Sequence, residues 1–277
     1  MADSATITQR FGLFSAFHYR QYRLLWISSL TTHTGRWMET VVVAWLVLEL
    51  TNSPFLVGLV GACRTAGMLL GPFSGTIADH FDRRRILIVA QLIPAAGALI
   101  IMMLFLTERL EVWHLFAFVL VEGISFSLDF ATRFPLAADI VEGHHLPNAT
   151  SLLFVTMGIT SGIGPLLGGS LLGLIQASGC FAMISACFFV SLLTLVFMKP
   201  ASSARSISQQ SAWKNFIGGL RYVRDDKPIL ALILIAAIIN FFIPPIILTL
   251  VPIFARDILH VGASGLGQLM GAMGLVA

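Results

Sequence analysis

Four charged residues stand inside otherwise apolar stretches of this sequence, at Arg36, Glu39, Arg64 and Glu122. Ionisable groups in the middle of a membrane are costly and usually face a partner or a water-filled cavity, so each is a candidate functional residue. Counted at about 1.5 Å per residue from the ends of their predicted helices, all four fall at a similar depth. Two acids and two bases at one depth could neutralise one another across helices.

The chemistry that these residues suggest is proton transfer. We expect Glu39 or Glu122 to take up and release a coupling proton, with Arg36 and Arg64 lowering its proton affinity in one state. Arg36 and Glu39 are three residues apart, so on a helix they can face the same cavity. Two static ion pairs that hold the bundle together are an equally open interpretation.

Further polar residues lie close to these four along the chain. Asp129 lies seven residues after Glu122 and four before Arg133, nearer the predicted cytoplasmic side, and we expect Asp129 and Arg133 to form a gate pair. His33 lies one turn before Arg36 and could relay protons, with a packed polar residue as the alternative. Asn240 lies near the middle of a predicted helix that two prolines distort, which makes it a candidate for a cavity wall.

Sequence motifs for enzymes and nucleotide binding are absent. There is no G-x-x-x-x-G-K-[ST], no H-E-x-x-H and no G-x-S-x-G. The three cysteines lie in apolar stretches without a CxxC pattern or a neighbouring histidine at metal-ligand spacing. We therefore expect no enzyme, no bound metal and no cofactor, with energy supplied by a proton gradient rather than by ATP.

The elements that must position these residues are membrane-spanning helices. Of the 277 residues, 57% are hydrophobic and only 11% are charged, against roughly a quarter charged in soluble domains. The apolar residues come in blocks of about 20, which matches the thickness of a bilayer. The predicted spans are residues 22–50, 55–78, 86–106, 112–134, 146–176, 179–198 and 228–254, followed by a short apolar block from 262.

This pattern predicts an all-α membrane protein with a six-helix bundle and the start of a second one. The expected regions are a cytoplasmic N-terminus with a surface helix (1–21), the N-terminal bundle (22–198), a cytoplasmic linker with an amphipathic helix (199–227) and the truncated start of the second bundle (228–277). Most of the 17 Lys and Arg residues fall on the side of the N-terminus, which predicts that this side is cytoplasmic.

The loop between the second and third predicted spans carries small, acidic and basic residues in a spaced pattern. Its matching residues are Gly75, Asp79, Arg83 and Arg84. The pattern resembles the G-x-x-x-D-R-x-G-R-R loop of the major facilitator superfamily, with His80 in place of a base and Asp82 in place of the second glycine. The resemblance implies that Asp79 and Arg83 help to hold the outward-facing state. A basic loop that only sets topology is the alternative.

The fifth predicted span is rich in glycine around one proline. The residues are Gly158, Gly162, Gly164, Pro165, Gly168 and Gly169. Small residues one turn apart let helix backbones pack closely, and the proline removes a helical hydrogen bond and permits a bend. The spacing is similar to the antiporter motif of proton-coupled exporters in that superfamily. Plain helix packing is the simpler interpretation.

Other stretches resemble the branch of the superfamily that contains the enterobactin exporter and related macrolide and drug exporters. They include residues 44–51, 147–149 and 252–257. Members have twelve helices, so on this resemblance the chain would stop within helix eight. The implied protein is a proton-coupled exporter of a bulky hydrophobic or aromatic compound, multi-pass in the bacterial inner membrane and monomeric if full length. Its partners would be the lipid bilayer and a small organic substrate, without nucleic acid.

Two alternatives remain open on the sequence alone. A solute importer of the same fold would carry the same motifs, and only the direction of transport separates it from an exporter. A truncated membrane fragment that transports nothing and serves as an interaction subunit would have one bundle and part of another, with the cavity between bundles open to lipid.

Overall fold

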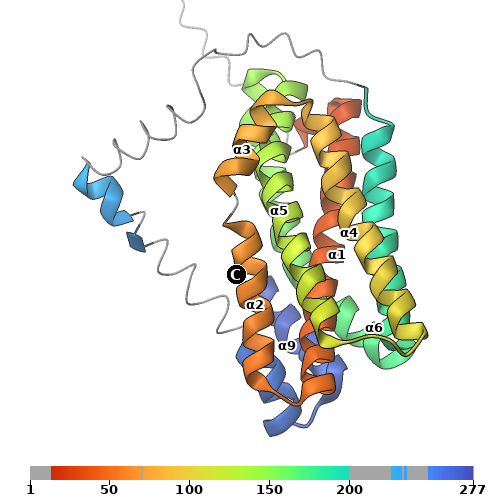
Figure 1. The fold of residues 1–277 in the computed structure, drawn as a ribbon. Helices are drawn as coiled ribbons and strands as arrows, with labels where there is room; N and C mark the ends of the chain where they lie inside the picture. The colour runs from red at the N-terminus through yellow and green to blue at the C-terminus, as the bar shows by residue number, and fades with distance from the viewer. Residues whose placement is uncertain (1–13, 70, 200–225, 233, 236–248, 277) are drawn as a thin grey trace, which may run out of the picture.

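The computed structural model describes residues 14–69, 71–199, 226–232, 234–235 and 249–276. Most of them form long helices that lie side by side (Figure 1). No strand occurs in this described part of the chain. The α-helices are α1 (Arg20–Thr51), α2 (Pro54–Met68), α3 (Gly71–His80), α4 (Arg83–Leu106), α5 (Val112–Ile140), α6 (Leu146–Val196) and α9 (Gly262–Val276). Shorter elements are the 3₁₀-helices η1 (Ser15–His18) and η2 (Gly143–His145) and the π-helix η3 (Phe254–Ile258).

Local sequence signals explain where the helices begin and end. Asn52 adopts a left-handed conformation with φ of 50° and its N–H donates to the Leu48 carbonyl, which ends α1, and Pro54 then stands in the first turn of α2. Asp82 caps α4 by accepting a hydrogen bond of 2.8 Å from the Arg85 backbone N–H. The tight turn predicted between the first two spans is therefore present.

Three stretches are long and apolar enough to cross a membrane by length and composition, among the described residues: α4, α5 and residues 143–196. The third stretch contains two helices, because Gln176 has φ of 61° and ψ of 178° and interrupts α6. This interruption lies where the predicted fifth span ends. Helix α1 has 32 residues, about 48 Å, but His33, Arg36 and Glu39 interrupt its apolar sequence.

Several predicted elements look different in the structure or lie outside it. The predicted second span, 55–78, is described as two helices, α2 and α3, rather than one. Most of the region predicted to hold an N-terminal surface helix (1–21) lies outside the described residues. Within the rest, Ser15–His18 form the short 3₁₀-helix η1, and the Ala16 N–H donates to Asn148 Oδ1 at 3.0 Å. The amphipathic linker helix and the middle of the predicted seventh span lie outside the described residues, whereas the apolar block from 262 forms α9.

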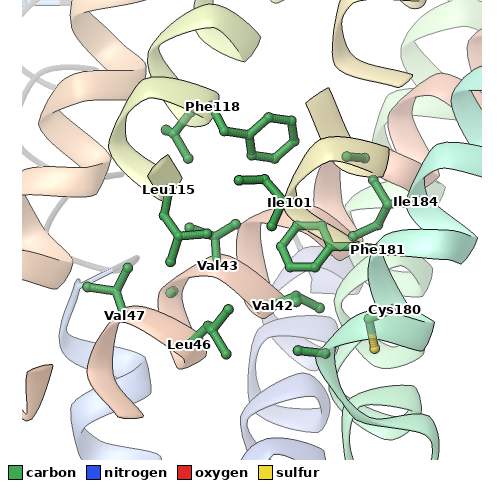
Figure 2. Close-up of a cluster of buried hydrophobic side chains, with 14 of the residues drawn as sticks. Val42, Val43, Leu46, Val47, Ile101, Leu115, Phe118, Cys180, Phe181 and Ile184 are labelled. Carbon is green, nitrogen blue, oxygen red and sulfur yellow. The ribbon is translucent and has the colours of Figure 1, made fainter. Parts of the chain in front are cut away.

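Two apolar cores occupy opposite ends of the bundle. One core joins the second half of α1 to α4, α5 and the C-terminal part of α6, with Val43, Ile101, Phe118 and Phe181 among its members (Figure 2). The other joins the start of α1 to Leu87, Leu136 and Leu195 at the far ends of the same helices. Between the two cores each of these four helices contributes buried polar residues. The polar residues therefore form a layer in the middle of the bundle.

The crossing of α2 and α5 brings two backbones into close contact. A Cβ atom at Gly67 would lie 2.5 Å from the Leu120 carbonyl oxygen and 2.8 Å from the Ile124 nitrogen, which no real side chain tolerates. Gly123 faces the same crossing from α5, where its added Cβ would lie 3.2 Å from the Cα of Gly67. Only glycine permits this approach, and it sets Arg64, one turn before Gly67, against Glu122.

We predict that Gly67→Val destabilises the bundle by about 1–3 kcal/mol, because the new methyl groups force α2 and α5 apart. Thermal unfolding of the purified protein in detergent measures this. The matched control is Gly61→Val on the same helix, since an added Cβ at Gly61 meets nothing within 4 Å among the described residues. Equal stability of the two variants would contradict the glycine crossing.

Candidate functional site

Arg64 joins two buried carboxylates that come from two different helices. Its Nη1 donates to Glu122 Oε2 at 2.6 Å and its Nη2 donates to Glu39 Oε2 at 2.7 Å. The side chains of Glu39 and Glu122 are 0% and 1% exposed. Arg36 completes the group, with its Nε 3.3 Å from Glu122 Oε1. The structure thus brings together all four residues that the sequence placed at one depth, and we call them the charge cluster.

Three helices supply the charge cluster. Arg36 and Glu39 lie one turn apart on α1, Arg64 lies on α2 and Glu122 lies on α5. The cluster is electrically balanced, since two guanidinium groups face two carboxylates. In a medium of low dielectric constant such a balance is a condition for burial, because an unpaired charge there costs several kcal/mol or more.

The two arginines differ in how well they are bonded. Arg64 donates to both carboxylates, whereas Nε, Nη1 and Nη2 of Arg36 are buried without a hydrogen-bond partner among the described residues. The Arg36 guanidinium lies over the ring of Phe126, 4.9 Å from its centroid, which is a cation–π contact. Within the same described part, Oε1 of Glu39 and Oε1 of Glu122 also lack hydrogen-bond partners. Arg64 is therefore the residue that links the two carboxylates of the cluster, and Arg36 keeps unused hydrogen-bond donors.

Asp129 and Arg133 form a second buried group below the cluster. Arg133 Nη2 donates to Asp129 Oδ1 at 2.6 Å, and both side chains are at most 2% exposed. The pair is part of a closed hydrogen-bonded ring across α1, α4, α5 and α6, in which Gln91 donates to Asp129 at 2.7 Å and Arg133 donates to Ser28 at 3.1 Å. The remaining links of this polar ring are Ser28 with Ser191, Thr32 with Ser191 and Thr32 with Gln91.

The polar ring shows what the sequence did and did not predict. The proximity of Asp129 and Arg133 followed from their spacing, but their neutral partners Gln91, Thr32, Ser28 and Ser191 were missed. Their signal was a polar residue every third or fourth position of an apolar helix, as at Ser28 and Thr32. The gate role stays a prediction. His33 of α1 is 5% exposed, and its relay role also stays a prediction.

Other predicted site residues lie away from the cluster or outside the description. Asn240 falls outside the described residues. Asp79 lies in α3, and its side chain is likewise outside the description. Gly75, also in α3, is partly exposed. Among the described residues no three His, Cys, Asp or Glu side chains gather as metal ligands would.

The arginines of the loop motif tie helix ends together. Arg83 Nη1 donates to Asp139 Oδ2 at 2.6 Å and to the Pro135 carbonyl at 3.2 Å, both on α5. Arg84 donates to the Leu195 and Val196 carbonyls at the end of α6, at 2.8 and 2.6 Å. The aspartate that replaces the motif glycine, Asp82, caps α4, so this departure from the family pattern has a structural use. A gating role of the loop stays a prediction.

The glycines of the fifth span face two different neighbours. Gly164 and Gly168 pack against α1, where an added Cβ at Gly168 would lie 2.9 Å from the Met38 carbonyl oxygen. Gly162 and Gly169 pack against α9, where a Cβ at Gly169 would lie 2.5 Å from the Cα of Gly267. The Pro165 carbonyl lies against Gly267, while an added Cβ at Gly158 meets nothing within 4 Å among the described residues. Close packing on two sides accounts for most of this motif.

Comparison with known proteins places these features in a family. Residues 11–277 match the family model described as transmembrane secretion effector, a group of the major facilitator superfamily. The chain belongs to this family. The predicted fold class, an all-α membrane protein of the major facilitator type, is thereby confirmed, as is the superfamily resemblance. The family is one of membrane-spanning transporters rather than enzymes.

Curated relatives carry names of transporters and exporters. The chain is 23% identical over 60% of its length to the staphyloferrin A transporter of Staphylococcus aureus, covering 42% of that protein. It is 22% identical over 91% of its length to the multidrug efflux pump Tap of Mycolicibacterium fortuitum, and 23% identical over 93% to the enterobactin exporter of Citrobacter koseri. In both of these cases it covers 65% of the relative, so the chain spans 42–65% of the length of these three proteins.

We predict that Arg64→Met destabilises the bundle by about 3–5 kcal/mol, because it removes the short bonds to both buried carboxylates and leaves Glu39 without an ion-pair partner among the described residues. Arg36→Met is the matched variant in the same cluster and should cost clearly less, since Arg36 makes a single ion pair, of 3.3 Å, and Arg64 still bonds both carboxylates. Adding Glu39→Gln to Arg64→Met should recover part of the loss by restoring the charge balance. Chemical denaturation of the protein in detergent measures all three. A larger loss of unfolding free energy in Arg36→Met than in Arg64→Met would contradict the role of Arg64 as the link between the two carboxylates.

Proposed function

We propose that this major facilitator chain works in a proton-coupled exporter of a bulky hydrophobic or aromatic compound, of the siderophore or drug type, by alternating access. The observation that carries the proposal is the charge cluster, in which one arginine holds carboxylates of α1 and α5 at 2.7 and 2.6 Å in the middle of the bundle. A buried carboxylate that loses its cation must take up a proton, so breaking and making these bonds links protonation to helix movement.

Glu39 is the carboxylate that we assign to the proton. Glu122 forms ion pairs with two guanidinium groups, Arg64 at 2.6 Å and Arg36 at 3.3 Å, whereas Glu39 forms an ion pair with Arg64 alone among the described residues. Glu39 therefore loses less electrostatic stabilisation when it becomes neutral. Its Oε1 is buried and accepts no hydrogen bond within the described part of the chain, so it has a free position for a proton.

The consequence of protonation follows from the geometry of Arg64. A neutral Glu39 no longer holds Nη2 by charge, so this bond between α1 and α2 weakens while Glu122 keeps Nη1. One proton thereby weakens the link between two helices whose relative movement would open one side of the protein and close the other. Two relatives are named as an efflux pump and an exporter, and these names support export of the substrate in exchange for the proton.

The membrane, the energy source and the binding partners complete the proposed function. The chain lies in the bacterial inner membrane with its N-terminus in the cytoplasm, as the distribution of Lys and Arg favours. The proton gradient supplies the energy without a bound cofactor. Its partners are the bilayer and a small organic substrate, without nucleic acid, and the complete transporter acts as a monomer.

We predict that Glu39→Gln abolishes proton-driven accumulation of substrate in inside-out vesicles that contain the transporter, while exchange of labelled for unlabelled substrate continues. The amide cannot release a proton but still accepts a hydrogen bond from Arg64. Glu122→Gln should impair both activities, because Arg36 and Arg64 then lose a shared partner.

The matched control is Glu49→Gln, an exposed glutamate on the same helix, which should transport normally. Normal proton-driven transport in both Glu39→Gln and Glu122→Gln would leave the cluster as static ion pairs and overturn the proposal. Accumulation in right-side-out vesicles in place of inside-out ones would make the protein an importer.

A further inference from the structure

Arg36 presents buried hydrogen-bond donors that nothing in the charge cluster uses. Its side chain is 6% exposed, and Nη1 and Nη2 have no acceptor among the described residues. A buried donor without an acceptor costs about 1–3 kcal/mol, and more when the group is charged. Glu122, the neighbouring acid, is already held by Arg64 at 2.6 Å. Nη1 and Nη2 of Arg36 are therefore free to donate to another acceptor.

A row of phenylalanine rings leads to this guanidinium. Phe126, Phe130 and Phe134 follow Glu122 on α5 at intervals of four residues, which places all of them on one face of the helix. Successive ring centroids lie 6.1 and 5.2 Å apart, and Phe154 of α6 continues the row at 4.9 Å from Phe134. We call these four rings the aromatic ladder. It begins at Arg36, whose guanidinium lies 4.9 Å from the Phe126 centroid.

The aromatic ladder is accessible at its outer part. Phe130 is 45% exposed and Phe154 is 57% exposed, while Arg36 at the inner end is buried. From Phe126 to Phe134 the helix rises about 12 Å, enough for one or two aromatic rings placed end to end. Under the orientation proposed above, this path runs from the cytoplasmic side to the middle of the membrane.

We propose that Arg36 and the aromatic ladder form a binding site for a neutral aromatic compound with oxygen acceptors, such as a phenol or an aryl amide. The rings supply stacking surface, and the unused N–H groups of Arg36 bond the phenol or carbonyl oxygen. This deepens the proposed function, on which it rests for the direction of the path.

The neutrality of the ligand follows from the charge balance. Two arginines and two glutamates cancel, so an added anion would leave a net negative charge in a medium of low dielectric constant. An anion would also strengthen proton binding at the neighbouring glutamates, and ligand and proton would then bind together. Exchange of the ligand for a proton requires instead that binding of one weakens binding of the other. A neutral acceptor satisfies Arg36 without changing the charge.

The test is a saturation-transfer NMR titration of the full chain in lipid nanodiscs, with para-hydroxybenzamide as the probe. The expected order is clear binding of this amide, and weaker binding of para-hydroxybenzoate, its anionic analogue of the same shape. Phe130→Leu should weaken the amide about threefold to tenfold, the range of one aromatic pair. Arg36→Met should weaken it by about tenfold or more, the loss of a bond to a charged donor.

The controls separate this site from lipid and from folding. Phe189 is 53% exposed on α6 outside the ladder, so Phe189→Leu should bind the probe as the unchanged protein does. If Arg36→Met fails to fold, Arg36→Lys keeps the charge but loses the planar fork, and it should also bind more weakly. Equal effects of Phe130→Leu and Phe189→Leu would mean that the ladder only contacts lipid, and would overturn the proposal.

Two further results distinguish this inference from the proposed function. Tighter binding of the benzoate than of the amide, rising as the pH falls, would make the site an anion site and contradict the neutral ligand. Absence of binding by either probe, in a protein whose proton-driven transport depends on Glu39, would overturn the ladder site and leave the proposed function standing.

Discussion

The structure depends on one arginine that bonds two buried carboxylates from different helices. Arg64 lies between Glu39 of α1 and Glu122 of α5, with both distances below 3 Å and almost no exposure to solvent. Apolar side chains gain little by leaving lipid for another helix, so directed polar contacts decide which helices meet in a membrane. Here the contact also requires a close backbone crossing, which Gly67 and Gly123 allow. The close crossing of α2 and α5 therefore decides both where the charge cluster lies and which of its charges are paired.

The polar layer divides the bundle into two apolar halves. One apolar core lies at each end of α1, and the charge cluster and polar ring lie between them. The two polar groups differ in character. The polar ring closes on itself, with Asp129 and Arg133 bonded to each other and to Gln91 and Ser28. The charge cluster keeps unused acceptors and donors, which suits a group that exchanges a proton or binds a ligand.

The sequence predicted the four charged residues well, for a physical reason. Charges in apolar stretches must find partners of opposite charge. Once their depth was counted, few partners other than one another remained for Arg36, Glu39, Arg64 and Glu122. The same reasoning could not tell which arginine would bridge the acids, because this depends on the α2 and α5 crossing. It also gave no sign that α2 and α3 would be separate helices, since hydropathy does not report helix breaks.

Residues of ordinary type were the hardest to predict. Serine and threonine are common in membrane helices and often bond their own backbone, so the spacing of Ser28 and Thr32 was too ordinary a signal to predict the polar ring. Phenylalanine is equally common on lipid-facing surfaces, and the aromatic ladder is recognised only when Phe154 of another helix lies beside Phe134. The glycines of α6 were predicted to allow close packing, but that they serve α1 and α9 on opposite sides needed the structure.

The central claim is that Glu39 changes its protonation while Arg64 keeps Glu122. Infrared difference spectroscopy of the transporter in lipid, with the glutamate carboxyl carbons isotopically labelled, observes this directly as the pH is changed. We expect the protonated carboxyl band of a buried glutamate to appear as the pH falls, to be missing in Glu39→Gln and to be retained in Glu49→Gln. A spectrum in which no buried glutamate changes its ionisation over the range where the protein stays folded would contradict it.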